Sequence, residues 1–216
     1  MLKAYLLQSS VIYIFIFSTF LHAIFGLQWK NKTHRYVLLI LTIFVINEII
    51  STFQVAYSLT FKLNHTIVTE IHSVLWLVIL RNSVRFPKIV DGLLIAFITF
   101  CFCDMFFIEG WAILNCYSFI VGAFVYLIFF LIESFYQLKQ ENFRFFFSNQ
   151  FILLMSPVLF FIGLTFMLAF KSRGIITTVI FGDIYLYRII MTVVNIVYYS
   201  LLNIYIYREK KKLYEF

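Results

Sequence analysis

Long apolar runs, each close to the length that crosses a bilayer, alternate with short polar segments along nearly the whole chain. About 20 apolar residues in a helix cross the hydrocarbon core, and a helix satisfies its own backbone hydrogen bonds where there is no water. On this measure the pattern predicts seven membrane-spanning helices, at residues 6–27, 36–61, 66–80, 89–108, 112–133, 150–170 and 184–207. A further apolar stretch, residues 175–181, could be a re-entrant or interfacial segment.

The composition agrees with this pattern. Of the 216 residues, 63% are hydrophobic and 12% are charged, and the mean hydropathy is +0.96. A soluble domain of this size needs a larger share of polar residues to cover its surface. We therefore expect an all-α protein with a single transmembrane domain, residues 1–216, that folds as a polytopic seven-helix bundle in a lipid bilayer.

The positions of the basic residues predict the orientation of this bundle, because short cytoplasmic loops retain Lys and Arg. One side collects 12 of them, whereas the other side has 4 and Arg188 lies within a span. The first group is Lys30, Lys32, Arg35, Arg81, Arg85, Lys88, Lys139, Arg144, Arg208, Lys210, Lys211 and Lys212. The N-terminus is thus predicted outside and the C-terminus in the cytoplasm, although Lys3 weakly opposes this orientation.

The formal net charge of +7 raises the question of a nucleic-acid partner. The basic residues are scattered over loops that flank predicted spans, and only residues 208–212 form a cluster. Membrane orientation and contact with anionic lipid headgroups account for such a distribution. We expect no nucleic-acid partner.

Polar residues at helical spacing mark the inner faces of three spans. In the last span, Arg188, Thr192, Asn195, Tyr199 and Asn203 share one face. The second span carries Asn47, Ser51, Gln54 and Ser58, with Glu48 at the edge of this stripe, and the fifth carries Asn115, Ser118, Gly122 and Tyr126. These faces are expected to look into the bundle.

Ionisable side chains inside a bilayer are costly, so they normally face a partner or a water-filled cavity. We expect an outer cluster of Glu70, His72, Asp104 and Arg188, with a deeper layer of Glu48 and Asn195 below it. The predicted ligand-binding or polar-core residues are Glu48, Glu70, His72, Asp104, Arg188, Asn195 and Tyr199. Interhelical hydrogen bonds that hold a bundle together, at about 0.6–2 kcal/mol each, are the alternative interpretation of the same residues.

The histidines do not form a pattern typical of a metal site or a catalytic triad. His34 and His65 fall in predicted loops, and His22 and His72 lie near opposite ends of their spans, so they cannot share an ion. The last span also has no lysine that could form a Schiff base with retinal. We therefore expect no catalytic residues, no metal and no cofactor, and a protein that is not an enzyme.

Four segments of the chain carry a resemblance to a known group of proteins. They are Ile46-Asn47-Glu48-Ile49, Glu70-Ile71-His72-Ser73 followed by Trp76, Ser156-Pro157 with Gly163, and Asn195-Ile196-Val197-Tyr198-Tyr199. With these segments the chain resembles a group of uncharacterised seven-span proteins of the bacterial cytoplasmic (inner) membrane. The resemblance implies a companion of two-component signalling, whose partner would be a protein such as a histidine kinase.

These observations favour an integral membrane sensor or signal-transduction subunit. It would respond to an outer-side or intramembrane ligand and pass the change to a partner, because the basic tail, residues 208–216, is too small to carry signalling chemistry. Seven spans also permit a 3+1+3 arrangement like that of SWEET and PQ-loop proteins, so a small-solute transporter is the alternative. A structural subunit of a larger membrane complex is the third possibility, suggested by the many lipid-facing aromatic residues.

Overall fold

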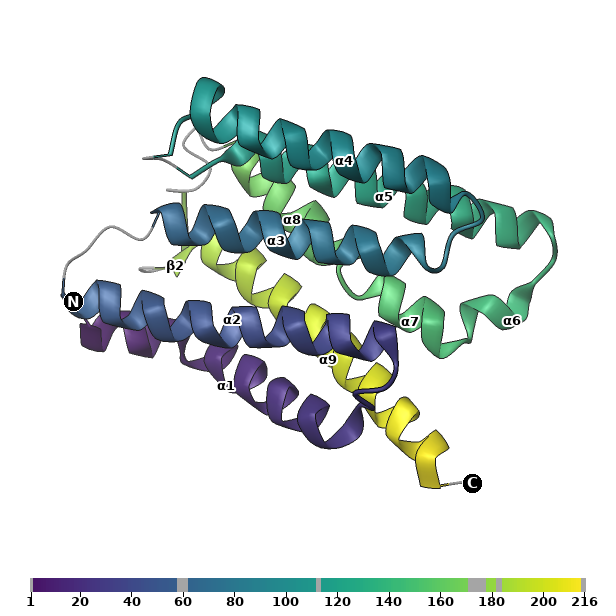
Figure 1. The fold of residues 1–216 in the computed structure, drawn as a ribbon. Coiled ribbons are helices and arrows are strands. Elements are labelled where there is room, and N and C mark those ends of the chain that lie inside the picture. Colours follow the sequence, from purple (N-terminus) through teal and green to yellow (C-terminus); the bar gives the residue numbers. More distant parts are fainter. Residues whose placement is uncertain (1, 58–61, 112–113, 171–177, 182–183, 215–216) are drawn as a thin grey trace.

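A computed structural model of the chain describes residues 2–57, 62–111, 114–170, 178–181 and 184–214 (Figure 1). For residues 2–11, 62, 181, 184, 213 and 214 only the backbone is described. The described part is all-α apart from one two-stranded hairpin.

Most of the chain forms long helices that run antiparallel to one another, and shorter helices and two strands lie between them. They are α1 Leu2–Gly26, α2 Lys32–Ala56, α3 Lys62–Arg81, α4 Pro87–Cys103, the π-helical turn η1 Asp104–Ile108, α5 Cys116–Lys139, α6 Phe143–Phe146, α7 Asn149–Met155, α8 Val158–Ala169, β1 Val179–Phe181, β2 Ile184–Tyr185 and α9 Leu186–Tyr214. Side chains fix two of the helix starts: Asn31 accepts a hydrogen bond from Thr33 N, and Ser148 accepts one from Phe151 N.

Six helical segments of the described chain are long and apolar enough to cross a membrane. They are Lys32–Ala56, Leu63–Arg81, Pro87–Ile108, Cys116–Lys139, Asn149–Ala169 and Leu186–Lys212. The chain is therefore a multi-span helical membrane protein. In α1, the apolar segment with described side chains is Ile12–Gly26, so the seventh span stays a prediction.

Several predicted boundaries differ from the observed ones. The helix predicted at residues 112–133 is α5, which begins at Cys116 and continues to Lys139. The helix predicted to begin at residue 66 begins at Lys62, and α2 begins at Lys32, so His65 and His34 lie in helices and the prediction that they lie in loops is wrong. These helices continue beyond their apolar runs, because a helix does not have to end where its apolar residues end.

The apolar segment before α9, residues 175–181, was predicted to be re-entrant or interfacial, and its described end forms one strand of a hairpin. Residues 179–181 form β1, which pairs antiparallel with β2, whereas residues 175–177 lie outside the described residues. The predicted last span, residues 184–207, thus begins with two strand residues before the helix starts at Leu186. The helix then continues past Tyr207 to Tyr214.

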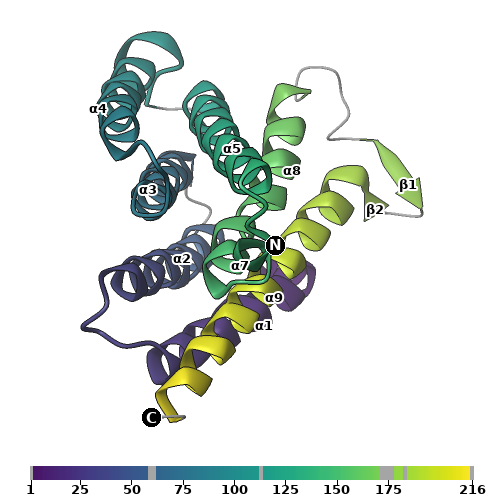
Figure 2. The ribbon, with the colours of Figure 1, turned by 90° about the vertical axis from the view of Figure 1, so that its right-hand side faces the viewer.

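The helices pack as a closed ring, which an end-on view makes visible (Figure 2). In this ring α1 packs on α2, α2 on α3, α3 on α5, α5 on α8, α8 on α9, and α9 back on α1. Helix α4 lies outside the ring against α3 and α5, and it belongs to the least buried of the six apolar segments. The interior of the ring therefore receives side chains from six helices.

Glycines allow close approach at three helix contacts, as small residues do in membrane bundles. A Cβ built on Gly122 of α5 would lie 2.6 Å from the ring of Phe97 in α4. A Cβ on Gly163 of α8 would lie 2.6 Å from Val194 of α9, and one on Gly26 would lie 2.6 Å from Ile206. The ring is thus tightly packed at these points.

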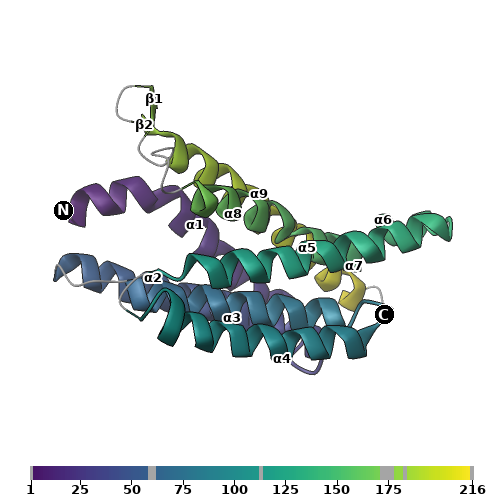
Figure 3. The same cartoon turned by 90° about the horizontal axis from the view of Figure 1, so that it is seen from above.

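The bundle has two distinct ends (Figures 1 and 3). We call one the hairpin end, because β1, β2, η1 and the start of α3 lie there, and the other the tail end, because α6 and the C-terminus lie there. The helix ends that carry the 12 basic residues of the predicted cytoplasmic side all lie at the tail end. The arrangement of the helices therefore gathers the positive charge at one end.

Candidate functional site

A cavity of about 270 Å³ lies inside the ring, in the half of the bundle nearer the hairpin end. We call it the central cavity. Its walls come from α1, α2, α3, α5, α8 and α9, and they are mainly apolar. Polar groups reach it from α2, α3, the start of α5 and α9, whereas α1 and α8 contribute apolar side chains; the polar residues are Asn47, Glu48, His65, Thr69, Asn115, Asn195 and Tyr199. Such a combination of apolar walls and a few hydrogen-bonding groups is typical of a small-molecule pocket.

Three of the predicted site residues meet in this cavity. Glu48 lies on α2, and Asn195 and Tyr199 lie one turn apart on α9. The Asn195 amide donates to the Met191 carbonyl oxygen at 2.7 Å, which leaves its side-chain oxygen available for other donors. The deeper layer expected for Glu48 and Asn195 thus corresponds to one wall of the central cavity.

Asn47 and His65 extend the polar lining around the cavity. Asn47 accepts a hydrogen bond of 2.6 Å from the amide of Asn64, which links α2 to α3. His65 stands in the first turn of α3, four residues before Thr69, so both side chains lie on the same face. The sequence analysis missed His65 because it placed the start of the helix too late.

Aromatic side chains close the central cavity on the side of the tail end. We call Phe44, His72, Trp76, Phe160 and Tyr198 the aromatic floor. The His72 ring centre lies 4.8 Å from that of Phe44 and 5.2 Å from that of Phe160, and both phenylalanines also line the cavity. The His72, Trp76 and Tyr198 side chains are at most 2% exposed. The floor is therefore a packed layer that separates the cavity from the tail end.

The tautomer of His72 follows from its hydrogen bond to Trp76. Trp76 Nε1 donates to His72 Nε2 at 2.8 Å, and an indole nitrogen can only donate. The accepting Nε2 therefore carries no hydrogen, and the imidazole proton is on Nδ1. His72 was expected beside Glu70, Asp104 and Arg188, but the structure puts it in the aromatic floor, in contact with rings.

Glu70 and Asp104 do lie together, on α3 and at the start of η1. Asp104 is fully buried, and its Oδ2 accepts hydrogen bonds from Ser118 N at 2.9 Å and Ser118 Oγ at 2.5 Å. Glu70 lies close enough to Ser118 and Asp104 to interact with both. Glu70 Oε1 and Asp104 Oδ1 are buried without a hydrogen-bond partner. We call Glu70 and Asp104 the acidic pair.

A third carboxylate, that of Glu109, lies beside Asp104 at the hairpin end. Glu109 Oε2 accepts from Tyr117 N at 2.8 Å. Partial burial raises the pKa of Glu109, and the negative charge of Asp104 acts in the same direction. The π-helical turn makes this arrangement possible, because Glu109 N and Gly110 N both turn back to the Asp104 carbonyl oxygen.

Arg188 stands in the first turn of α9, next to the hairpin, and is half-buried. The main helix contacts of α9 are with α1, α7 and α8, and none of the ion pairs within the described residues joins a cation to Glu70 or Asp104. Of the expected outer cluster, the described contacts bring together Glu70 and Asp104.

A second polar pocket of about 440 Å³ lies at the tail end, and we call it the tail pocket. Its centre is Glu209 of α9, which accepts from the Asn149 amide at 2.5 Å and pairs with Lys212 at 2.7 Å. His34 Nε2 lies 3.4 Å from the other carboxylate oxygen of Glu209. The sequence analysis missed these residues because it treated His34 as a loop residue and Glu209 as part of a basic tail.

Comparison with protein-family models, with curated proteins and with solved structures finds no match to this chain. In the part of the chain that the structure describes, no group of three or more His, Cys, Asp or Glu side chains is placed to hold a metal ion. This multi-span helical membrane protein thus contains four candidate features: the central cavity, the aromatic floor, the acidic pair and the tail pocket.

Proposed function

We propose that this protein is a non-enzymatic membrane sensor, a signal-transduction subunit that binds a small molecule in the central cavity. The observation that carries the proposal is the position of that cavity: six helices line it, and the aromatic floor closes it toward the tail end. A ligand there would touch every helix of the ring, so its binding would bias the packing of the whole bundle.

The lining of the cavity suggests the class of ligand. A volume of about 270 Å³ is at the lower edge of the range of about 300–1,000 Å³ that is usual for small-molecule sites. The walls are mostly apolar, with amide, hydroxyl, imidazole and carboxyl groups around them. We therefore propose a small, largely apolar ligand that carries several hydrogen-bonding groups.

Helices α2 and α9 offer a direct connection from the cavity to the tail pocket. On α9, Tyr199 lines the cavity and Tyr205 lines the tail pocket, a distance of about 9 Å along the helix. On α2, Glu48 lines the cavity and His34 lines the tail pocket. A shift of either helix would alter the contacts of Glu209, and a cytoplasmic or membrane partner such as a histidine kinase would read that change.

The proposed setting is the cytoplasmic membrane of a bacterium, with seven spans, the N-terminus outside and the tail end in the cytoplasm. The basic residues at the tail end support this orientation, since short cytoplasmic loops retain positive charge. The ligand would then reach the central cavity from the outer side.

A test of the proposal uses the accessibility of a cysteine in the cavity wall. In a background without Cys101, Cys103 and Cys116, we would introduce Leu164→Cys, which faces the central cavity, and Leu159→Cys, an exposed position of the same helix, as the control. A membrane-impermeant thiol reagent is added to intact spheroplasts or to inside-out vesicles. We expect Leu164→Cys to react from the outer side only, and Leu159→Cys to react from neither side because it faces lipid.

A small-solute transporter is the second candidate, and one observation favours it: pockets that contain polar side chains lie on both sides of the aromatic floor. The aromatic floor favours the sensor, because it closes the central cavity toward the tail end. Reaction of Leu164→Cys from both sides would overturn the sensor proposal in favour of the transporter. Reaction from neither side would overturn the proposal of a ligand cavity.

A further inference from the structure

The charged group in the lining of the central cavity is the carboxylate of Glu48 on α2. Tyr199 of α9, which lines the same cavity, is close enough to this carboxylate to feel its charge. Tyr13 of α1 also lies within reach of it. The carboxylate is therefore held where α1, α2 and α9 meet, at a wall of the cavity, and an ionisable side chain inside a membrane bundle commonly marks the path or site of a ligand.

Two uncharged side chains of the lining offer oxygen atoms as hydrogen-bond acceptors. The Thr69 hydroxyl donates its hydrogen back along α3, to the carbonyl oxygens of His65 and Thr66 at 2.8 and 2.9 Å. The Asn195 amide is anchored on the Met191 carbonyl oxygen at 2.7 Å, which leaves the side-chain oxygen of Asn195 available. Both oxygens can accept a hydrogen bond from a ligand.

Asn47 differs from these two residues, because its side-chain oxygen already accepts a hydrogen bond of 2.6 Å from Asn64. Its amide is thus a donor. With Glu48, Thr69 and Asn195 as acceptors, the lining whose hydrogen bonds are described offers more acceptors than donors, together with a carboxylate. A matching ligand supplies several donors and positive charge, and an ammonium group has three donors and no acceptor.

Aromatic rings form much of the apolar wall of the same cavity. The Phe160 ring centre lies 6.5 Å from that of Phe44 and 6.4 Å from that of Phe119, and both pairs meet edge to face. Aromatic rings attract cations to their faces and pack favourably against a further ring. The volume of about 270 Å³ is small for a ligand site, so the body of the ligand is about the size of one ring.

We propose that the central cavity binds a small aromatic amine, with its ammonium group against Glu48 and its ring against the phenylalanines of the wall. This inference rests on the proposed function, because it names the chemical class of the ligand to which the sensor responds. Asn195, one turn before Tyr199 on α9, would accept a hydrogen bond from the ammonium group. A carboxylic acid would place a second negative group beside Glu48, and an alcohol of the same shape would supply one donor and no charge.

Binding of phenethylamine to the full-length protein tests this inference. The protein is placed in nanodiscs of phosphatidylcholine, and saturable binding of the radiolabelled amine is measured against empty nanodiscs. Phenethyl alcohol and hydrocinnamate, which carry the same ring on an uncharged and a negative arm, serve as matched probes. We expect the amine to bind about tenfold or more tightly than either, the difference that one charge-assisted hydrogen bond commonly makes.

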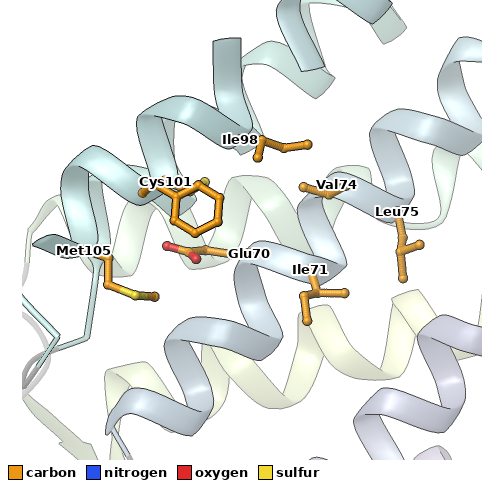
Figure 4. Close-up of a pocket in the computed structure, with 8 residues that line it drawn as sticks. Glu70, Ile71, Val74, Leu75, Ile98, Cys101 and Met105 are labelled. Carbon is orange, nitrogen blue, oxygen red and sulfur yellow. The ribbon is translucent and has the colours of Figure 1, made fainter. Parts of the chain in front are cut away.

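Two matched substitutions locate the ammonium group. Glu48→Gln keeps the shape of the side chain and removes its charge, so we expect it to weaken phenethylamine binding by about tenfold or more and to leave phenethyl alcohol binding unchanged. Glu70→Gln is the control. Glu70 lines a groove between α3 and α4 on the outside of the ring, whose described lining residues are all different from those of the central cavity (Figure 4). We expect Glu70→Gln to leave the affinity for the amine unchanged.

A further variant, Leu164→Phe, fills the central cavity and leaves Glu48 intact. We expect it to weaken the binding of the amine and of the alcohol alike. This variant keeps the test decisive if Glu48→Gln does not fold. Folding of each variant is checked by its thermal unfolding midpoint in the same nanodiscs.

Other results would overturn the inference. Equal affinity for the amine and the alcohol, both lowered by Leu164→Phe, would show a ligand cavity without selectivity for a cation, and the sensor proposal would stand. Weaker binding in Glu70→Gln with unchanged binding in Glu48→Gln would assign the amine to the groove between α3 and α4. A lack of saturable amine binding would also overturn the inference. The thiol reaction of Leu164→Cys needs no ligand, so it decides separately whether the cavity is open from the outer side.

Discussion

Single glycine residues at the contact of α5 with α3 and α4 show how closely this bundle is packed. Gly122 of α5 faces Phe97 and Ser73, from α4 and α3, at distances that leave no room for a methyl group. Gly92, by contrast, lies in α4 with open space where its Cβ would be. The two glycines are therefore a matched pair: the same substitution has a steric cost at one position and not at the other.

We predict that Gly122→Ala destabilises the protein and that Gly92→Ala does not. The added methyl group at residue 122 would lie 2.6 Å from a Phe97 ring atom, and overpacking of this kind costs about 1–3 kcal/mol. At residue 92 the gain in helix propensity is the only change, and it favours alanine. Thermal unfolding in nanodiscs measures both variants, and a midpoint for Gly122→Ala equal to that of the wild type would contradict the packing described here.

Helical spacing of single residues in the sequence predicted part of the buried polar lining. Helical spacing predicted that Asn115, Ser118, Gly122 and Tyr126 share an inward face of α5, and all four are buried. It could not predict the aromatic floor, because His72 and Tyr198, whose polar atoms lie 3.3 Å apart, are separated by 126 positions along the chain. Spacing within one helix indicates which face is buried, but not which helix covers it.

At the scale of elements, the break between α7 and α8 has an identifiable cause. Pro157 has no backbone N–H, so it cannot complete the hydrogen bond to the Leu153 carbonyl oxygen that a continuous helix would make. The Ser156 hydroxyl donates to that oxygen instead, at 2.8 Å. The next carbonyl oxygen, that of Leu154, accepts a hydrogen bond of 2.7 Å from the Tyr126 hydroxyl of α5.

The sequence analysis predicted a span at residues 150–170, and the structure has an apolar span there, Asn149–Ala169, which is interrupted at Ser156-Pro157 into α7 and α8. The proline was visible, but a proline alone does not tell whether a membrane helix bends or breaks. The outcome depends on which side chains satisfy the freed carbonyl oxygens. Here Tyr126 does so from another helix, and this contact could not be derived from local sequence.

We predict that Tyr126→Phe destabilises the bundle at this break. The substitution leaves the Leu154 carbonyl oxygen buried without its donor, and the loss of one interhelical hydrogen bond in a membrane protein costs about 0.6–1.7 kcal/mol. Tyr117→Phe, at an exposed position of the same helix, serves as the control and is expected to have no effect. Unfolding in mixed micelles measures both free energies, and equal values for the two variants would show that the hydrogen bond does not stabilise the break.

At the scale of the whole molecule, the hydrophobic pattern predicted the class of the fold because the bilayer imposes one length on every span. The order of packing was not predictable in this way. Helices α3 and α5 pack on each other and leave α4 outside, although the apolar runs of α4 and α5 have the same mean hydropathy, 2.1. The difference lies in their buried faces: α5 buries large side chains such as Phe119, Tyr126 and Phe130 along its length, whereas the buried side chains of α4 are Val90, Phe97 and Cys101.

The remaining prediction for the whole molecule concerns the seventh span and the orientation of the bundle. Helix α1 runs from the hairpin end to the tail end over 25 residues, alongside α2 and α9. If it crosses the membrane, an epitope tag on the N-terminus and a cysteine in the turn after α1 must lie on opposite sides. We expect the tag outside and Lys30→Cys inside, because the basic tail end is predicted to be cytoplasmic.

Labelling of spheroplasts with an impermeant maleimide measures this arrangement, in a background without the three native cysteines. Trp111→Cys at the hairpin end is expected to react in intact spheroplasts, whereas Lys30→Cys and Asn142→Cys at the tail end are expected to react only after permeabilisation. The reverse result for all three positions would invert the orientation without changing the number of spans. A tag that is accessible only after permeabilisation, together with the expected result for the three cysteines, would leave α1 on the cytoplasmic side. The protein would then have six membrane spans. One wall of the central cavity would come from α1, a helix that does not span the bilayer.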